Sequence, residues 1–327
     1  MQAMHRALEG ELGAKKHAYY VADGVKCLKL TETKLVKWIT NLEKEEVLRV
    51  TQAHSTDVVL LGLAERGVKI QYAHWHSTGL EKNLPPEAIA TGFYNLPQDI
   101  FRDFKPRADL AQLRHLVDAR LALMEHRKAD FLRLGALKRS IGLADEDSLP
   151  KQLQIVEDEL LADKRKFETP VDKKLSEVAE SIPECVAFNA ASGVADSWVT
   201  SGTVVAFLGD ISRFPMVSSL WHYCGQHVVE GLAPKRKRGE PGTWHPRVRT
   251  ALWLLGTSII KNRNNRWRPV YEQFLDKELQ EHDVKHPGCK TKQGHCGARA
   301  RRRVVKEILK EFYLTVCGET EDVLKPI

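Results

Sequence analysis

The stretch that decides the fold begins Gly209-Asp210-Ile211-Ser212-Arg213-Phe214-Pro215 and ends in a run of basic residues at Arg303. A turn with glycine, a short basic loop and a basic helix follow one another in it, with aromatic residues between them. From Ala233 to Arg303 there are 18 Lys and Arg residues against 6 Asp and Glu residues, a net charge of +12. The whole chain carries only +7, which leaves −5 for the rest. The positive charge is therefore concentrated in one segment.

A segregated cationic segment is suited to a polyanion, because contact with phosphates releases the counterions around them. The plainer interpretation is a solvated face that serves solubility. The concentration of charge in one segment favours nucleic-acid binding over that interpretation. The candidate phosphate-binding residues are the basic side chains of the loop and of two helices: Lys235, Arg236, Lys237, Arg238, Arg247, Arg249, Arg301, Arg302 and Arg303.

Length and composition set the class of protein. A chain of 327 residues has room for two domains, and a hydrophobic content of 43% is enough to build ordinary cores. No apolar run is long enough to span a bilayer, and the first residues lack the apolar core of a signal peptide. The six scattered cysteines are typical of reduced thiols rather than of a disulfide framework. We expect a cytoplasmic protein without membrane partners.

The first 107 residues are predicted to form an α/β domain. Aromatic and β-branched residues predict strands, and a glycine at position 67 marks the end of a helix. Strand, helix and strand in that order predict a βαβ unit in a partly parallel sheet. The predicted strands are 16–21, 47–50 and 68–73, and the predicted helices are 30–41 and 57–66.

The rest of the chain is predicted to be helical. Apolar residues at helical spacing predict one helix over 108–139, a break at 142–150 and a second helix over 151–168, with further helix over 171–182. This hairpin spacer, residues 108–182, either packs on itself or dimerises as a coiled coil. The last domain, residues 183–327, is predicted to contain a turn at 192–194 that leads into a helix over 199–209, and helices over 246–261, 266–281 and 299–317.

The last domain resembles a known family over residues 193–316. Leu208-Gly209-Asp210-Ile211-Ser212-Arg213-Phe214 is followed at the expected distance by Trp221-His222-Tyr223-Cys224-Gly225. Arg247-Val248-Arg249-Thr250-Ala251-Leu252-Trp253 is similar to an arginine-rich helix of the family, and Ala298 to Lys306 is similar to its closing segment. The chain thus resembles the DEDD-type insertion-sequence transposases of the "one-ten" group, which include the pilin-gene-inverting recombinases.

The resemblance implies a ribonuclease-H-like (Holliday-resolvase-like) domain, a helical coiled-coil spacer and a C-terminal transposase domain that begins with a helix-hairpin-helix. It implies metal-dependent cleavage and strand transfer of DNA in a mobile element, by a homo-oligomer associated with a prokaryotic nucleoid. Four acidic residues of the family hold the divalent metal, and a serine attacks the phosphate. Several members are guided by an RNA from their own element, so a guide RNA is a second implied partner.

The catalytic residues of the family are matched only in part. The first acidic position falls on Glu11, and the second falls at Gln52, which is neutral. The nearest carboxylates to the last acidic pair are Glu81 and Glu87, of which we assign Glu81 to the metal site. Thr243 is the only hydroxyl residue in the loop where the family has its nucleophile. Glu11 and Thr243 are therefore the catalytic candidates, and Glu11 and Glu81 the candidate ligands of Mg²⁺.

These mismatches leave two function classes open. One is an active DNA transposase, and the other is a non-catalytic DNA- or RNA-binding protein derived from such an enzyme. Histidine and cysteine also recur at two places, His222 to His227 and His286 to Cys296, but their spacing does not favour a structural zinc site. Of the tryptophans among the arginines, Trp253 is predicted to lie in the core and Trp267 to be exposed for base stacking.

Overall fold

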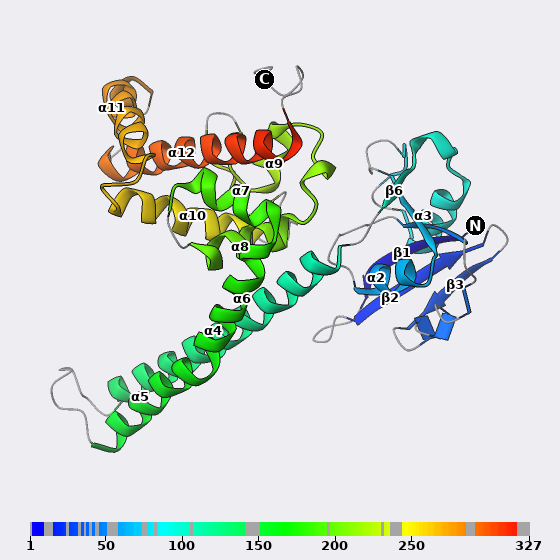
Figure 1. Cartoon of the computed structure of the whole chain (residues 1–327), viewed down its shortest axis with the longest axis horizontal. Helices are drawn as coiled ribbons and strands as arrows, with labels where there is room; N and C mark the ends of the chain where they lie inside the picture. Colours follow the sequence, from blue (N-terminus) through cyan, green and yellow to red (C-terminus); the bar gives the residue numbers. More distant parts are fainter. Residues whose placement is uncertain are drawn as a thin grey trace. The chain divides into compact units, whose positions relative to one another are not determined.

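The computed structural model describes residues 2–9, 16–23, 26–31, 34–35, 37–38, 41–42, 46–50, 58–73, 78–81, 84–104, 107–140, 151–194, 197–229, 232–235, 244–285 and 292–318. The chain divides into two compact units, Met1–Ala111 and Gln112–Ile327. The first unit is α/β and the second is helical, which confirms the predicted fold class at that level (Figure 1). Among the described helices, none combines the length and the apolar character needed to cross a bilayer.

The N-terminal unit is built on a mixed six-stranded sheet in the order β3-β2-β1-β4-β5-β6. Strands β1 to β3 form an antiparallel meander, β4 and β5 run parallel to β1, and β6 is antiparallel to β5. The parallel pair β4–β5 is connected by helix α2, as the predicted βαβ unit requires. The strands are β1 (Gln2–Glu9), β2 (Lys16–Ala22), β3 (Cys27–Leu30), β4 (Val47–Val50), β5 (Lys69–Tyr72) and β6 (Arg102–Phe104).

Apolar side chains cover both faces of this sheet. On one face, Leu48 and Val50 of β4 pack with Leu60 and Leu63 of α2 (Val58–Glu65). On the other face, α3 (Pro86–Asn95) and the 3-10 turn η2 (Gln98–Ile100) supply apolar residues such as Phe93. Strand β4 is buried on both sides because it lies in the middle of the sheet.

Arg49 is a charged residue in this otherwise apolar centre, and its side chain is only 3% exposed. Its Nη1 donates to the carbonyl oxygens of Tyr94 and Leu96, both at 2.8 Å, and its Nη2 donates to Oε1 of Gln98 at 2.7 Å. The guanidinium also lies over the Phe101 ring, 4.1 Å from its centre. Burial lowers the pKa of Arg49. The residue caps the C-terminal end of α3 and attaches that helix to the sheet.

The predicted elements of this unit are found with one difference. Strands over 16–21, 47–50 and 68–73 and the helix that stops before Gly67 are confirmed. The helix predicted over 30–41 begins too early, because Leu30 pairs with Tyr19 as the last residue of β3. Of the rest of that range, residues 34–35 and 37–38 are described as helical.

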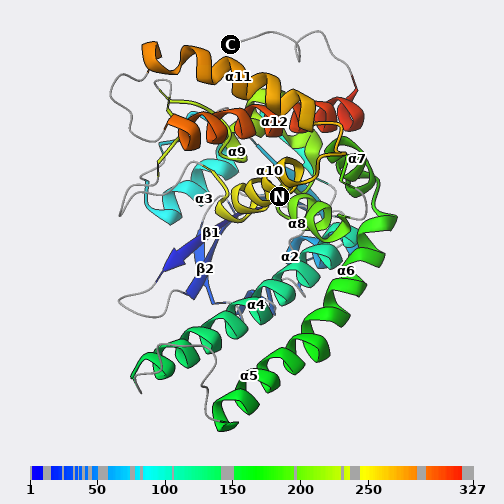
Figure 2. The same ribbon diagram turned by 90° about the vertical axis from the view of Figure 1, so that its left-hand side faces the viewer.

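The second unit begins with long helices that lie side by side (Figures 1 and 2). Helix α4 (Ala108–Ser140) runs along α5 (Lys151–Asp163), the π-helical turn η4 (Lys164–Glu168) and α6 (Thr169–Ser181). Arg120 of α4 pairs with Asp172 of α6, and Arg127 pairs with Glu168 of η4, both at 2.5 Å. The predicted break at 142–150 lies outside the described residues. The division of the helical part into a spacer and a last domain remains a prediction.

Seven further elements lie in the described part of the second unit. They are α7 (Pro183–Ser192), α8 (Trp198–Leu208), the 3-10 turn η5 (Ile211–Arg213), α9 (Val217–Tyr223), α10 (Pro246–Lys261), α11 (Arg268–Lys285) and α12 (Lys292–Cys317). Helix α8 is the central helix, because every residue from Ser201 to Leu208 is buried. Helix α12 packs on α7, α9, α10 and α11. It starts seven residues earlier than the predicted 299–317, so His295 and Cys296 lie in a helix and not in a loop.

Candidate nucleic-acid interface

Most of the predicted catalytic and metal-binding positions lie outside the described residues. These are Glu11 and Thr243, together with Gln52, and the same holds for Arg236, Lys237 and Arg238 of the basic loop. Glu81 is described and exposed. Within the described ranges, no three residues of the types His, Cys, Asp and Glu come together in a way that could hold a metal ion. The metal site therefore remains a prediction from the sequence.

The start of α10 places Arg247 and Arg249 in different surroundings. Pro246 opens the helix, and the backbone N–H of Val248 donates to Nδ1 of His245, the N-cap residue, at 3.4 Å. Two residues apart on a helix means about 200° of rotation, so the two arginines point away from each other. Arg247 pairs with Asp118 of α4 at 2.7 Å. Arg249 instead lies over the Trp244 ring, at 4.8 Å, and donates from Nη1 to the Pro234 carbonyl oxygen at 3.0 Å.

His245 itself is neutral at ordinary pH. Its ring lies against Phe207, with 4.7 Å between the ring centres, and stacks on Tyr223 at 5.7 Å. The pKa of His245 is lowered to about 4, chiefly by burial and in addition by the nearby charges of Arg114, Arg247 and Arg213. His245 therefore acts as a helix cap within an aromatic cluster.

Three consecutive arginines of α12 point in three directions, because each residue turns the helix by about 100°. Arg301 crosses α10 at Gly256, lies over the Trp253 ring at 4.7 Å and donates to Oγ1 of Thr257 at 3.3 Å. A Cβ atom at Gly256 would lie 2.6 Å from Cγ of Arg301, so the close crossing needs glycine there. Arg303 turns to α11, where it pairs with the buried Glu278 at 2.8 Å.

Arg302 points in the third direction and lies near Arg249. The pKa of Arg302 is lowered by burial first, and then by the positive charges of Arg249, Arg299 and Arg301. Lys235, the first residue of the basic loop, is exposed. The predicted phosphate-binding set thus divides. Arg247 and Arg303 are held in ion pairs with Asp118 and Glu278, whereas Arg249, Arg301 and Arg302 form no ion pair with a carboxylate of the described residues.

Two further basic residues, Lys306 and His227, lie near Arg302 and Arg249, and neither was among the candidate phosphate-binding residues. Together with Lys235, Arg249, Arg301 and Arg302 they form what we call the cationic surface. Lys306 lies one turn after Arg302 on α12, with Nζ over the Trp221 ring at 4.0 Å, and Nε1 of Trp221 donates to the Lys306 carbonyl oxygen at 3.1 Å. His227 follows α9 and stacks on His222 with ring centres 4.0 Å apart. The i, i+4 spacing from Arg302 to Lys306 is the signal that could have identified Lys306.

The candidate thiols for a zinc site are buried in the helical core. Cys224 is fully buried, and burial raises the pKa of its thiol far above the usual value. Cys296 is buried in α12, 3.5 Å from the Glu278 carbonyl oxygen. A buried thiol that stays protonated is a poor metal ligand. His286 and Cys289 lie outside the described residues.

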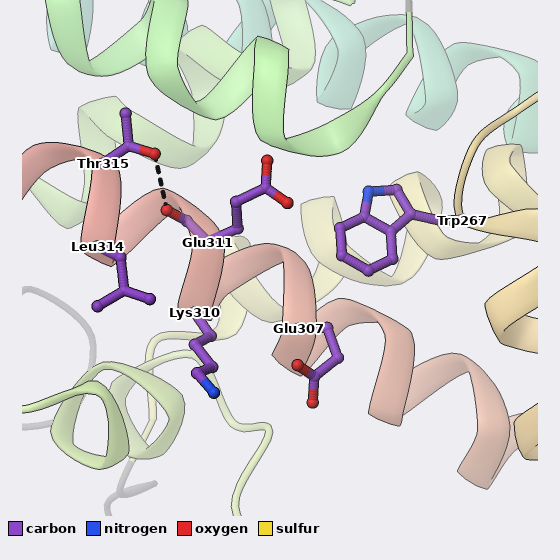
Figure 3. A pocket seen from close by; sticks show the side chains of 6 residues that line it. All are labelled: Trp267, Glu307, Lys310, Glu311, Leu314 and Thr315. Atoms are coloured by element: carbon purple, nitrogen blue, oxygen red, sulfur yellow. Dashed lines mark hydrogen bonds between the residues drawn. The ribbon is translucent and has the colours of Figure 1, made fainter. Parts of the chain in front are cut away.

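The exposure predicted for the two tryptophans is wrong for Trp253 and only partly met for Trp267. Trp253 is 49% exposed, because α10 packs on α8 and α12 through its other side. Trp267 is only partly exposed, and its Nε1 donates to the Ala191 carbonyl oxygen at 2.7 Å. Trp267 forms one wall of a pocket of about 450 Å³ (Figure 3). The other lining residues all come from α12: Glu307, Lys310, Glu311, Leu314 and Thr315.

That pocket does not belong to the cationic surface. Its lining includes the carboxylates of Glu307 and Glu311, of which Glu311 pairs with Arg266 at 2.6 Å. Carboxylates repel a phosphate backbone, so we assign no nucleic-acid contact to it.

Comparison of the chain with models of protein families and with curated proteins found no match.

Proposed function

We propose that this chain binds DNA through the cationic side of its helical unit and is a transposase related to the "one-ten" group. One observation carries the proposal. Arg249 and Arg302 come together from α10 and α12, partly buried and with no ion pair to a carboxylate of the described residues. Like charges held together at a protein surface need an anion to balance them, and a nucleic acid supplies anions at regular spacing. Phosphate contacts of this kind position a duplex without reading its sequence.

The N-terminal unit supports a ribonuclease-H-like domain within this proposal. Its antiparallel meander β1–β3 is joined through β1 to the parallel strands β4 and β5, in the order 3-2-1-4-5 with β6 added at the edge. A mixed sheet of this kind is compatible with the ribonuclease-H-like domain that the family resemblance implies. In this proposal Mg²⁺ bound by carboxylates, Glu11 among them, supplies the charge that stabilises the attacking and leaving oxygens. A guide RNA is the second partner that the same surface would accept.

The strand register favours the alternative, a non-catalytic binding protein derived from such an enzyme. Met4 of β1 is paired with Val50, the last residue of β4, and β1 continues for five more residues to Glu9. At about 3.3 Å per residue the ends of the two strands are therefore about 17 Å apart along the sheet. Two carboxylates share one metal ion only when they lie close together, so strand ends this far apart favour the alternative. Gln52 in place of an acid favours the same alternative.

Salt titration of DNA binding tests the proposed function. The full chain should bind duplex DNA with an affinity that falls steeply with salt. Replacing Lys235, Arg236, Lys237 and Arg238 together by glutamine should reduce the slope of log K against log salt by about 3–4, since each lost phosphate contact contributes about 0.9. Fluorescence anisotropy of a labelled duplex measures the slope. An unchanged slope would remove the basic loop from the interface, and absence of DNA binding by the wild type would refute the proposal.

A nicking assay separates the transposase from the non-catalytic alternative. The active enzyme should cleave DNA that contains the ends of its element only when Mg²⁺ is present, and Glu11→Ala should abolish the cleavage while leaving DNA binding intact. Gel analysis of supercoiled plasmid measures the cleavage. Cleavage that survives Glu11→Ala would show that Glu11 is not a metal ligand. Binding without any Mg²⁺-dependent cleavage would favour the alternative.

A further inference from the structure

Helix α12 packs against α9 and α10 (Figure 2). Four basic side chains come from these helices and from the residues that follow α9. Arg249 comes from α10, Arg302 and Lys306 come from α12, and His227 follows α9. His227 and Arg249 both lie at the Trp244 ring, 6.3 and 4.8 Å from its centre, and Lys306 is one turn from Arg302 on α12. Their charges also act on one another. The charges of Arg249 and Arg302 both lower the pKa of His227, Arg249 lowers that of Arg302, and Arg302 lowers that of Lys306, in each case in addition to burial or a neighbouring histidine.

Aromatic rings and a glycine fix the positions of these side chains. Arg249 lies over the Trp244 ring and Lys306 over the Trp221 ring, at 4.8 and 4.0 Å from the ring centres. Gly225 adopts a left-handed conformation with φ of 66°, and a Cβ atom there would lie 2.9 Å from Cδ of Arg249. The chain after α9 therefore packs directly on Arg249. The rings fix the two cations in place, and Arg249 also donates from Nη1 to the Pro234 carbonyl oxygen. The remaining N–H groups of the guanidinium and ammonium groups are the donors that a ligand could use.

The group differs from three other arginines of the unit, which are held in ion pairs. Arg247 pairs with Asp118, and both Arg299 and Arg303 pair with Glu278. Over the ranges that the structure describes, no carboxylate forms an ion pair with Arg249, Arg302 or Lys306, and Nδ1 of His227 is buried without a hydrogen-bond partner. Partly buried like charges repel one another, and an anion between them would relieve the repulsion.

We propose that Arg249, Arg302, Lys306 and His227 form a pocket for one phosphate group. The proposal rests on the proposed function in that the phosphate belongs to a nucleic acid. Two guanidinium groups and an ammonium group supply donors and positive charge for the phosphate oxygens, and an anion bound between them would favour protonation of the neighbouring His227. Arg247 and Arg303 form ion pairs with carboxylates, so they contribute less to the binding of the phosphate than Arg249 and Arg302 do.

Two pairs of variants test the pocket in the full chain. Arg302→Gln and Lys306→Gln each remove one charge from it. Arg263→Gln and Lys310→Gln remove the same charges elsewhere in the unit, Arg263 from the exposed turn after α10 and Lys310 from α12 one turn beyond Lys306. Calorimetry with inorganic phosphate at low salt measures the pocket alone, and anisotropy with duplex DNA, with and without a 5′-phosphate, measures the nucleic acid. Thermal unfolding checks that all four variants are folded.

We expect Arg302→Gln and Lys306→Gln each to weaken phosphate binding at least tenfold and to lower the salt slope of DNA binding by about 1. The two control variants should stay within about twofold of the wild type in phosphate binding, and Arg302→Lys should retain most of it. If the 5′-phosphate strengthens binding in the wild type but not in Arg302→Gln, the pocket takes a strand end; equal loss on both duplexes assigns it a backbone phosphate.

The failures of the pocket and of the proposed function can be told apart. If the wild type binds DNA and the pocket variants behave like their controls, the pocket is refuted and the proposed function stands. If the wild type binds inorganic phosphate but no DNA, the proposed function is refuted. If Arg302→Gln and Lys306→Gln then lose the binding of inorganic phosphate, the pocket is a site for free phosphate. A wild type that binds neither ligand overturns both.

Discussion

Replacing Arg49 by methionine should destabilise the N-terminal unit by about 2–4 kcal/mol, since it leaves three acceptors without this donor, at up to about 1–3 kcal/mol for each one that water does not reach. Two of these acceptors are the carbonyl oxygens of Tyr94 and Leu96 at the end of α3, and the third is Oε1 of Gln98. Methionine has a similar length and is apolar, so it fills the space but cannot donate. Urea unfolding gives the free energy, and hydrogen exchange should show α3 losing protection first.

Lys69→Met is the matched control for this variant. Lys69 lies on the neighbouring strand β5, where its side chain is exposed, and the same chemical change there should alter stability by less than about 0.5 kcal/mol. If Arg49→Met is no more destabilising than Lys69→Met, then Arg49 does not hold α3 on the sheet. Arg49→Lys should recover part of the loss, because one ammonium group can reach a carbonyl but cannot serve three acceptors in a fixed fork.

Local sequence signals predicted those elements whose bounds are set by neighbouring residues. The strand over 47–50 and the helix over 246–261 have the predicted bounds, since one is a short apolar run and the other starts at a proline. Strand β3 was missed because Cys27-Leu28-Lys29-Leu30 has no strong strand pattern of its own. It is held by pairing with β2, which the local sequence does not encode.

The candidate site was harder to predict, because charge balance depends on partners far away in the sequence. Arg247 is neutralised by Asp118, 129 residues earlier, and nothing in the basic segment itself distinguishes it from Arg249. The wrong expectation for Trp253 has a similar cause. It stands in an apolar stretch, but which side of α10 is covered depends on where α8 and α12 pack.

Replacing Glu278 by glutamine should both destabilise the helical unit and strengthen DNA binding. The Glu278 side chain is only 2% exposed and links α11 to α12, with Oε2 accepting from Nε of Arg299 at 2.6 Å and Oε1 lying 2.8 Å from Arg303. Loss of one partner from a buried ion pair costs about 3–5 kcal/mol, and we expect the lower end, about 3 kcal/mol, because both arginines are partly exposed. Thermal and urea unfolding measure the decrease in the free energy of unfolding.

The same substitution releases the charge of Arg303 next to the cationic surface. A freed arginine can contact one more phosphate, so the salt slope of DNA binding should steepen by about 1 if the proposed function holds. Glu272→Gln on the same helix is the control, because Glu272 is 54% exposed and pairs only with Arg268 one turn away, a pair typically worth about 0.5 kcal/mol or less. Lower stability with an unchanged slope would mean that Glu278 is purely structural and that Arg303 lies outside the DNA path. A slope that flattens instead would mean that the carboxylate orients Arg299 and Arg303 toward the phosphates, so that the ion pair belongs to the interface.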